Sequence, residues 1–187
     1  MPSIRVHSAS VEITEEIGRA LGTCMDPGAL LTMSGQLGAG KTAMTRGIAA
    51  GLGIEDKVTS PTFTLSQSYG PGTRGIILHH DDAYRLEGPE DFLAAGLAES
   101  LETDGVTVVE WAELVADALP EADVAVTVER VFEAQTPAPH LAEEQIVLPC
   151  DDVARVIRLQ FANETAMDCF LAALSPHIQV LDKEADE

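Results

Sequence analysis

One glycine-rich segment constrains the fold of this chain more than any other feature. Residues 35–42 read Gly-Gln-Leu-Gly-Ala-Gly-Lys-Thr and match the pattern G-x-x-x-x-G-K-[ST] without a mismatch. Glycines let the backbone turn its N–H groups inward around phosphate oxygens, and a helix that begins near Lys41 adds the positive end of its dipole. An apolar run at 29–33 precedes the segment, and helical spacing over 41–52 follows it. This order predicts a nucleotide phosphate site, with Lys41 on the β- and γ-phosphates and Thr42 as a ligand of Mg²⁺.

Alternation of apolar strands and helices predicts an α/β fold. Helical spacing and short apolar runs divide the chain into helices at 11–21, 41–52, 89–101 and 164–174, and strands at 29–33, 63–69, 76–80, 106–109, 124–128 and 154–161. Continuous apolar strands separated by helices are typical of a mostly parallel sheet, and the alternating pattern of the last two strands predicts an antiparallel extension on one edge. We therefore predict a three-layer P-loop NTPase fold.

The same pattern predicts the domain organisation. Residues 1–130 are expected to form the P-loop ATPase domain, and residues 131–187 a C-terminal strand and helix extension of the same domain. A loop rich in proline and alanine is expected at 134–144, and a frayed charged tail at 182–187.

The chain is strongly acidic, with a formal net charge of −20. Residues 81–123 hold thirteen acids and a single base, Arg85. Such a surface disfavours direct binding to nucleic-acid backbones and to anionic membranes. It fits solubility or adaptation to salt, or a face that docks on a basic partner.

Other sequence features predict a cytoplasmic protein. No apolar run approaches the roughly 20 residues needed to span a bilayer, and the first residues lack the apolar core of a signal peptide. The three cysteines, Cys24, Cys150 and Cys169, are far apart and odd in number. We therefore expect reduced thiols.

Carboxylates follow two of the predicted strands. Asp82 comes after the run at 76–80, and Glu110 comes directly after 106–109, where a parallel sheet would place them beside the phosphate loop. Asp81 competes with Asp82, and the sequence alone does not separate the two. The hydroxyl-rich segment 59–64 is either a switch loop that senses the γ-phosphate or a simple turn. The chain has no Asn-Lys-x-Asp element, so adenine is favoured over guanine.

Four segments together resemble one family, TsaE (also called YjeE), the small ATPase of bacterial tRNA threonylcarbamoyladenosine synthesis. They are residues 38–42, 60–65, 80–86 and 109–111, in the order and spacing of the family. The resemblance spans roughly residues 8 to 130. It departs at Asp81, where the family commonly has an apolar residue, and it is poor after about residue 131.

The resemblance implies roles for individual residues. Thr42 and Glu110 would hold Mg²⁺, and Lys41, Asp82 and Thr62 would be the catalytic residues. Asp82 would be the Walker-B-like acid that orients the attacking water, and Thr62 would lie in the first switch loop. Nucleotide contacts would come from Thr14, Gly38, Ala39, Gly40, Lys41, Thr42 and Ala43.

Two further residues each allow two interpretations. Trp111 is either a residue at the rim of the site or a packing tryptophan. Arg85 is either a transition-state arginine or an ion-pair partner.

The resemblance also implies a function. It indicates a Mg²⁺-dependent ATPase that binds the TsaD–TsaB pair and resets it during formation of N6-threonylcarbamoyladenosine at position 37 of tRNAs reading ANN codons. The tRNA would be contacted only through that complex. Intrinsic hydrolysis would be slow, because the sequence shows no clear arginine finger in cis.

Two alternatives remain, a small-metabolite P-loop kinase and a non-hydrolysing nucleotide-sensing adaptor. The kinase is disfavoured because residues 69–123 supply only Arg74 and Arg85 to clamp two anionic substrates.

Overall fold

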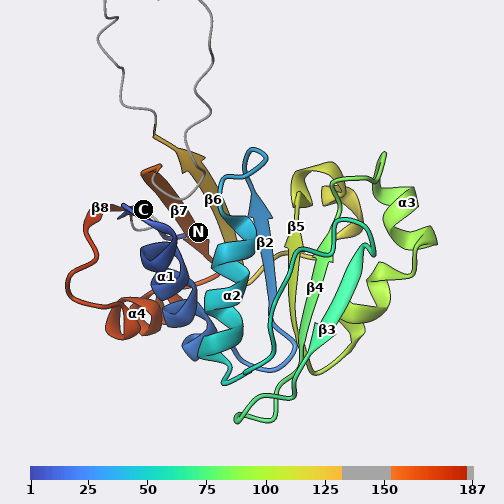
Figure 1. Cartoon of the computed structure of the whole chain (residues 1–187), viewed down its shortest axis with the longest axis horizontal. Coiled ribbons are helices and arrows are strands. Elements are labelled where there is room, and N and C mark those ends of the chain that lie inside the picture. The colour runs from blue at the N-terminus through green and yellow to red at the C-terminus, as the bar shows by residue number, and fades with distance from the viewer. Residues whose placement is uncertain (132–152, 185–187) are drawn as a thin grey trace, which may run out of the picture.

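Eight strands form one mixed sheet through the molecule. In the computed structural model, which describes residues 1–131 and 153–184, the strands are β1 (Ser3–Ser8), β2 (Leu30–Ser34), β3 (Ser66–Tyr69), β4 (Leu78–Asp82), β5 (Val106–Glu110), β6 (Val124–Arg130), β7 (Arg155–Phe161) and β8 (Val180–Glu184). Their order across the sheet is β3-β4-β5-β2-β6-β7-β1-β8 (Figure 1).

The sheet is parallel only at its centre. Strands β4, β5, β2 and β6 run parallel, β3 pairs antiparallel with β4, and β7, β1 and β8 extend the other side in antiparallel pairs. The predicted pairing of 154–161 with 124–128 is confirmed as β6–β7. The predicted antiparallel extension at one edge is therefore confirmed, but the sheet is not mostly parallel, and β3 adds a second antiparallel edge that was not predicted.

Strands β1 and β8 were not recognised in the sequence. The tail expected to be frayed from residue 182 instead contributes to β8, which pairs with β1. The side chains of β8 are mostly exposed, so no apolar pattern marks it. Backbone hydrogen bonds and the Arg5 guanidinium, whose Nε lies 2.8 and 2.9 Å from the two carboxylate oxygens of Asp182, attach it instead. Residues 185–187 lie outside the described residues.

Helices cover both faces of the sheet. They are α1 (Val11–Cys24), α2 (Lys41–Gly51), α3 (Pro89–Ala94) and α4 (Glu164–Ala173), with short 3₁₀ helices η1 (Leu97–Glu102), η2 (Ala112–Leu114) and η3 (Ala116–Ala118). The helix predicted over 89–101 is split, because Gly96, with φ of 76°, ends α3 and precedes η1. Within residues 1–131 and 153–184 we find no helix long and apolar enough to cross a membrane.

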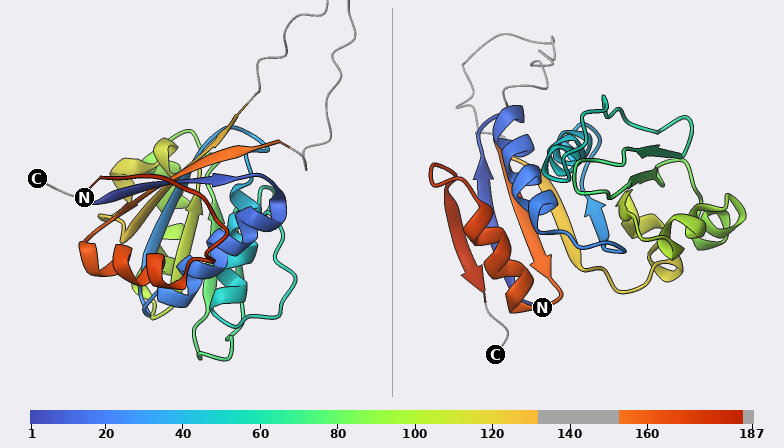
Figure 2. Two further views of the ribbon diagram at one scale, coloured as in Figure 1. Left: turned by 90° about the vertical axis from the view of Figure 1, so that its left-hand side faces the viewer. Right: turned by 90° about the horizontal axis from the view of Figure 1, so that it is seen from below.

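Two hydrophobic clusters lie between the sheet and the helices on its two faces. Alternate residues of the central strands point to opposite faces, so Leu31 and Val108 join the larger cluster with α1, α2 and α4. Leu30 and Val109 join a smaller cluster with α3 and the 3₁₀ helices. Figure 2 shows α1, α2 and α4 together on one side of the sheet.

Close packing of α1 on α2 sets the position of the segment that precedes α2. Gly18 and Gly22 of α1 lie against the backbone of α2, and Gly47 and Gly51 lie against the backbone of α1. A Cβ added at any of the four would overlap a carbonyl oxygen of the other helix. Since α2 begins at Lys41, this contact fixes the position of that lysine.

The structure corrects the expectation of reduced thiols. Cys24 at the end of α1 and Cys169 in α4 form a disulfide, with their Cα atoms 6.0 Å apart. The two residues are 145 positions apart in the chain, so their spacing carried no signal. Packing of α4 against α1 brings them together. Cys150 and the predicted loop at 134–144 lie outside the described residues.

Candidate functional site

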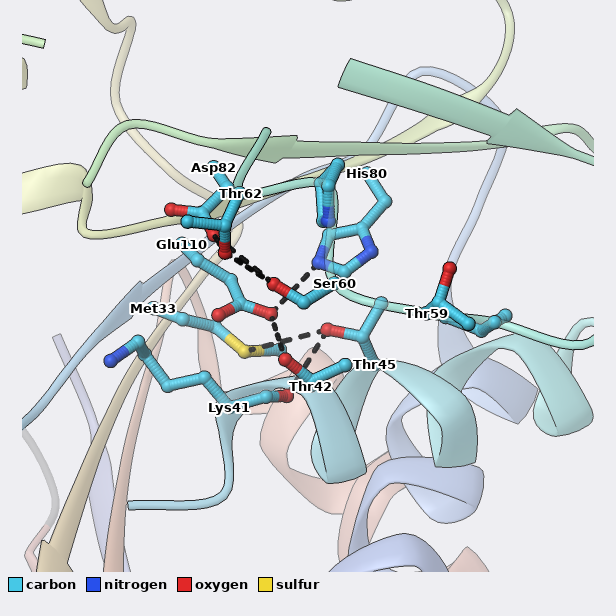
Figure 3. A network of polar contacts seen from close by, with 12 residues as sticks. Met33, Lys41, Thr42, Thr45, Thr59, Ser60, Thr62, His80, Asp82 and Glu110 are labelled. Carbon is cyan, nitrogen blue, oxygen red and sulfur yellow. Dashed lines mark hydrogen bonds and ion pairs between the residues drawn. The ribbon is translucent and has the colours of Figure 1, made fainter. Parts of the chain in front are cut away.

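The glycine-rich segment borders a cavity at the carboxyl ends of the parallel strands. The cavity has a volume of about 230 Å³ and receives side chains from β4, β5, α2 and the loop before β3. Of the residues predicted for the site, it brings together Gly38, Ala39, Gly40, Lys41, Thr42, Ala43, Thr62, Asp82 and Glu110. Figure 3 shows how the polar side chains among them converge.

The loop has the backbone conformation that the sequence requires of it. Gly35, Gly38 and Gly40 have φ angles of 137°, 71° and 116°, a region that favours glycine. The Nζ of Lys41 donates hydrogen bonds to the carbonyl oxygens of Gly35, at 2.5 Å, and Gln36, at 3.2 Å. The lysine charge is thus held within the curve of the loop, where an anion would meet it.

Competing influences act on the protonation of Lys41. Burial lowers the pKa of the ammonium group, and the carboxylates of Glu110, Glu113 and Asp82 oppose that shift. A bound phosphate would add negative charge on the same side and favour the charged lysine.

Glu110 is held by two donors. One carboxylate oxygen, Oε1, accepts hydrogen bonds from the hydroxyl of Thr42 at 3.0 Å and from Nε2 of His80 at 2.8 Å. Glu110 is only 3% exposed, so these two contacts replace most of its water. His80 was not singled out in the sequence, although it lies within the segment 80–86.

The donor set at this point fits Mg²⁺. A threonine hydroxyl and a carboxylate lie side by side at the start of α2, and Mg²⁺ is usually bound by one or two carboxylates together with substrate phosphates. Over the part of the chain that the structure describes, no group of three or more His, Cys, Asp and Glu residues is arranged to hold a metal. An ion here would therefore need oxygen ligands from the phosphates as well.

The geometry separates Asp82 from Asp81. Asp82 Oδ2 accepts hydrogen bonds from Thr62 at 2.6 Å and Ser60 at 3.3 Å, and its other oxygen accepts from the backbone N–H of Tyr84 at 3.0 Å. Asp81 points to the other face of the sheet, where its carboxylate accepts from Ser100 at 2.8 Å. Successive side chains of β4 alternate, so only Asp82 faces the cavity.

Aromatic rings flank the loop. The Nζ of Lys41 lies 3.8 Å from the centre of the Trp111 ring, and Tyr84 lies 5.0 Å from the same ring. Trp111 therefore lies beside the site, and it also packs against the smaller hydrophobic cluster, so the structure agrees with both interpretations. The Arg85 guanidinium stacks on Phe63, 4.4 Å from the ring centre. In residues 1–131 and 153–184 no ion pair involves Arg85, so these residues do not support its interpretation as an ion-pair partner.

Thr14 is placed differently from the other predicted residues. It is fully buried and does not line the cavity. Its hydroxyl lies 2.7 Å from that of Ser8 and donates to the carbonyl of Ser10 at 3.1 Å. Its predicted contact with the nucleotide stays a prediction.

Sequence reasoning missed Arg155, which also lines the cavity. Its Nε donates to the carbonyl of Ala39 at 2.7 Å, although the two residues are 116 positions apart. No local pattern marks such a contact, because it depends on how β7 pairs with β6. The basic residue Arg46 and the apolar Val11 complete the lining that was not foreseen.

Comparison with known proteins gives consistent matches. The family model described as "Threonylcarbamoyl adenosine biosynthesis protein TsaE" matches residues 8–136. The tRNA threonylcarbamoyladenosine biosynthesis protein TsaE of Treponema pallidum is 40% identical over 124 residues, covering 66% of this chain and 90% of that protein. The protein of the same name from Bacillus subtilis is 38% identical over 130 residues, covering 70% of this chain and 80% of that protein.

A solved structure extends the likeness to the fold. The crystal structure of YdiB from Bacillus subtilis aligns with a TM-score of 0.67 and 27% sequence identity, over 92% of this chain and 95% of that one. The matched range 8–136 includes the loop, Thr62, Asp82 and Glu110, and it ends before Arg155.

Proposed function

This chain belongs to the TsaE family of threonylcarbamoyl adenosine biosynthesis proteins, and from that premise we propose that it binds ATP with Mg²⁺ and hydrolyses it slowly. As a TsaE protein the chain acts in tRNA modification. The finer proposal is that ATP turnover resets the TsaD–TsaB complex during N6-threonylcarbamoyladenosine formation at position 37 of tRNAs reading ANN codons.

The observation that carries the proposal is the contact between Thr42 and Glu110 beside the loop that holds Lys41. Loop N–H groups and Lys41 bind and orient the phosphates. Thr42 and Glu110, which contact each other, would hold Mg²⁺, and the ion would neutralise charge on the phosphate oxygens. Asp82, fixed by Thr62, orients the water that attacks the γ-phosphate.

The charge distribution supports action through protein partners. The acidic stretch 81–123 gives this chain no broad basic surface for a tRNA backbone. TsaD and TsaB are therefore the proposed partners, with tRNA contacted only through their complex. We expect slow hydrolysis without them because Arg85, the one base of that stretch, lies on Phe63 and does not line the cavity.

Phosphate release from Mg²⁺-ATP, measured with and without the TsaD–TsaB pair, tests the proposal. Slow release that rises with the pair supports the ATPase. Phosphorylation of a metabolite would indicate a kinase, and ATP binding without turnover would indicate an adaptor. Trp111, the single tryptophan of the chain, reports on binding by its fluorescence because Lys41 lies over its ring.

Substitutions at the site sharpen the test. Glu110→Gln should lower Mg²⁺-dependent release at least about 100-fold, because a metal contributes several kcal/mol of charge stabilisation. Glu102→Gln, at an exposed carboxylate at the end of η1, is the matched control and should change nothing. A Lys41→Ala variant that binds ATP with unchanged affinity would overturn the proposed site.

A further inference from the structure

Two arginines from the β6–β7 pair lie against the phosphate loop. Arg130 and Arg155 are register partners at the ends of these strands. A Cβ added at Gly38 would lie 3.0 Å from Nη2 of Arg130, and one added at Gly40 would lie 3.0 Å from Nε of Arg155. The two guanidinium groups therefore lie along one side of the loop.

Arg155 is tied to the loop by its own hydrogen bonds. It is only 1% exposed, and it is among the largest fully buried side chains of the molecule. Nε donates to the Ala39 carbonyl at 2.7 Å, and Nη1 donates to the carbonyl of Val153 at 2.8 Å. Burial of a guanidinium is costly unless hydrogen bonds compensate, and the bonds to Ala39 and Val153 contribute to that compensation.

The C-terminal part of the chain has few basic residues. After residue 123 the sequence has twelve acids and only four bases, Arg130, Arg155, Arg158 and Lys183. Two of the four meet at the phosphate loop.

The hydrogen bond to Ala39 has a consequence for the next N–H group. The peptide between Ala39 and Gly40 is planar and trans, so its C=O and N–H point in opposite directions. When Arg155 holds the carbonyl, the N–H of Gly40 is directed away from β7. Gly40 has φ of 116°, and glycine at this position leaves room for the guanidinium.

We propose that Arg155 is a positioning residue for the nucleotide: by holding the Ala39 carbonyl, it aims the Gly40 N–H at the phosphates. The proposal rests on the proposed ATP site and adds to it a residue outside the matched range 8–136. It makes β7 part of the nucleotide-binding machinery. The C-terminal extension then has a role beyond completing the sheet.

Variants at Arg155 and a matched position on the same strand test this. Arg155→Lys keeps the charge but loses the Nε–H donor, and Arg155→Met removes both. Arg158→Lys and Arg158→Met are the controls, because Arg158 is half exposed and pairs with Glu184 at 3.5 Å, away from the cavity. The measurements are the ATP dissociation constant by calorimetry, steady-state kinetics, hydrogen exchange at residues 35–42 without nucleotide, and the melting temperature.

We expect both Arg155 variants to weaken ATP binding about tenfold, equivalent to about 1.4 kcal/mol. KM should rise with little change in kcat, since the N–H contacts phosphate in the ground and transition states alike. Hydrogen exchange of the backbone amides of residues 35–42 should accelerate, while the amides of α1 stay as protected from exchange as in the wild type. The Arg158 variants should match the wild type.

Three results would overturn the proposal. The first is folded Arg155 variants with wild-type affinity and loop exchange, and the second is an equal loss in the Arg158 variants. The third is unfolding of both Arg155 variants, which would assign the arginine to stability alone.

Failure of the proposed function is a separate outcome. A wild-type chain that binds ATP without hydrolysing it refutes the ATPase but leaves the affinity comparison intact. If the wild type binds no ATP, the phosphate-aiming role fails with the proposed function, while loop exchange still shows whether Arg155 orders the loop.

Discussion

His80 is one of the two residues whose side chains hold the carboxylate of Glu110. It is fully buried, and its Nε2 lies 2.8 Å from the oxygen that also accepts from Thr42. Groups that orient a metal ligand typically change metal affinity 10- to 100-fold when removed. We expect His80→Leu to raise the half-saturating Mg²⁺ concentration for ATP binding by about that range, and His80→Gln, which can still donate from its amide, to recover most of it.

A Mg²⁺ titration followed by calorimetry measures this shift. His79→Leu is the control, because His79 contacts Ser68 and Thr103 rather than the cavity. Equal Mg²⁺ dependence in the His80→Leu variant and the wild type would show that Thr42 alone suffices to hold Glu110.

Asp81 gives a prediction about pH. Its carboxyl is fully buried, one oxygen has no hydrogen-bond partner, and burial raises its pKa despite the opposing hydrogen bonds from Ser66 and Ser100. The folded state then binds the proton more tightly than the unfolded state. The stability that the protonated Asp81 carboxyl contributes is fully present below the unfolded pKa of about 3.9, and it is lost as pH rises through the raised pKa of the folded state.

Asp81→Asn should remove this decline. We expect it to be more stable than the wild type near neutral pH and to lose that advantage at acidic pH, as measured by urea unfolding at both. An advantage that does not vary with pH would contradict the titration of Asp81 as its cause.

The alternation that separates Asp81 from Asp82 was not available from the sequence, because it needs the bounds and pairing of β4.

At the level of secondary-structure elements, the α1–α2 contact controls the loop. Alanine favours a helix over glycine by about 1 kcal/mol, so Gly47→Ala would stabilise an isolated α2. In the protein its Cβ would overlap the carbonyl of Glu15, and overpacking typically costs about 1–3 kcal/mol. We expect a net loss of about 1–2 kcal/mol in urea unfolding and weaker ATP binding, because α2 carries Lys41.

Gly88→Ala is the control for this substitution. A Cβ at Gly88 would have no atom within 4 Å, and its extended backbone suits any residue. Unchanged stability of Gly47→Ala would mean that α1 and α2 separate at low cost.

Elements differed in how well the sequence predicted them. The strand, loop and helix around residues 35–42 follow from glycine conformations and apolar periodicity, both of which are local. Strand β8 and the contact of Arg155 with Ala39 depend on pairing between distant segments. The disulfide between Cys24 and Cys169 has the same origin, since only the docking of α4 on α1 brings the two cysteines together.

Net charge is a property of the whole molecule that affects its stability. A formal charge of −20 makes the folded chain repel itself, and unfolding relieves part of that repulsion by increasing the distances between acids. The acids of 81–123 are concentrated in α3, the 3₁₀ helices and the turns between them. These elements pack on the smaller hydrophobic cluster, which has less buried apolar surface to oppose the repulsion.

Added salt should therefore stabilise the protein. The Debye length falls from about 30 Å at 0.01 M to about 8 Å at 0.15 M ionic strength, which removes most repulsion across a molecule of this size. A gain of about 1 kcal/mol would raise the melting temperature by roughly 2–4 °C for a chain of this length. Scanning calorimetry over this range of NaCl at neutral pH measures the shift. Near the isoelectric point, about 4.3, the net charge vanishes and the same salt should have little effect. A melting temperature at neutral pH that stays constant or falls with NaCl would show that local ion pairs, such as Arg46 with Glu15, outweigh the net repulsion.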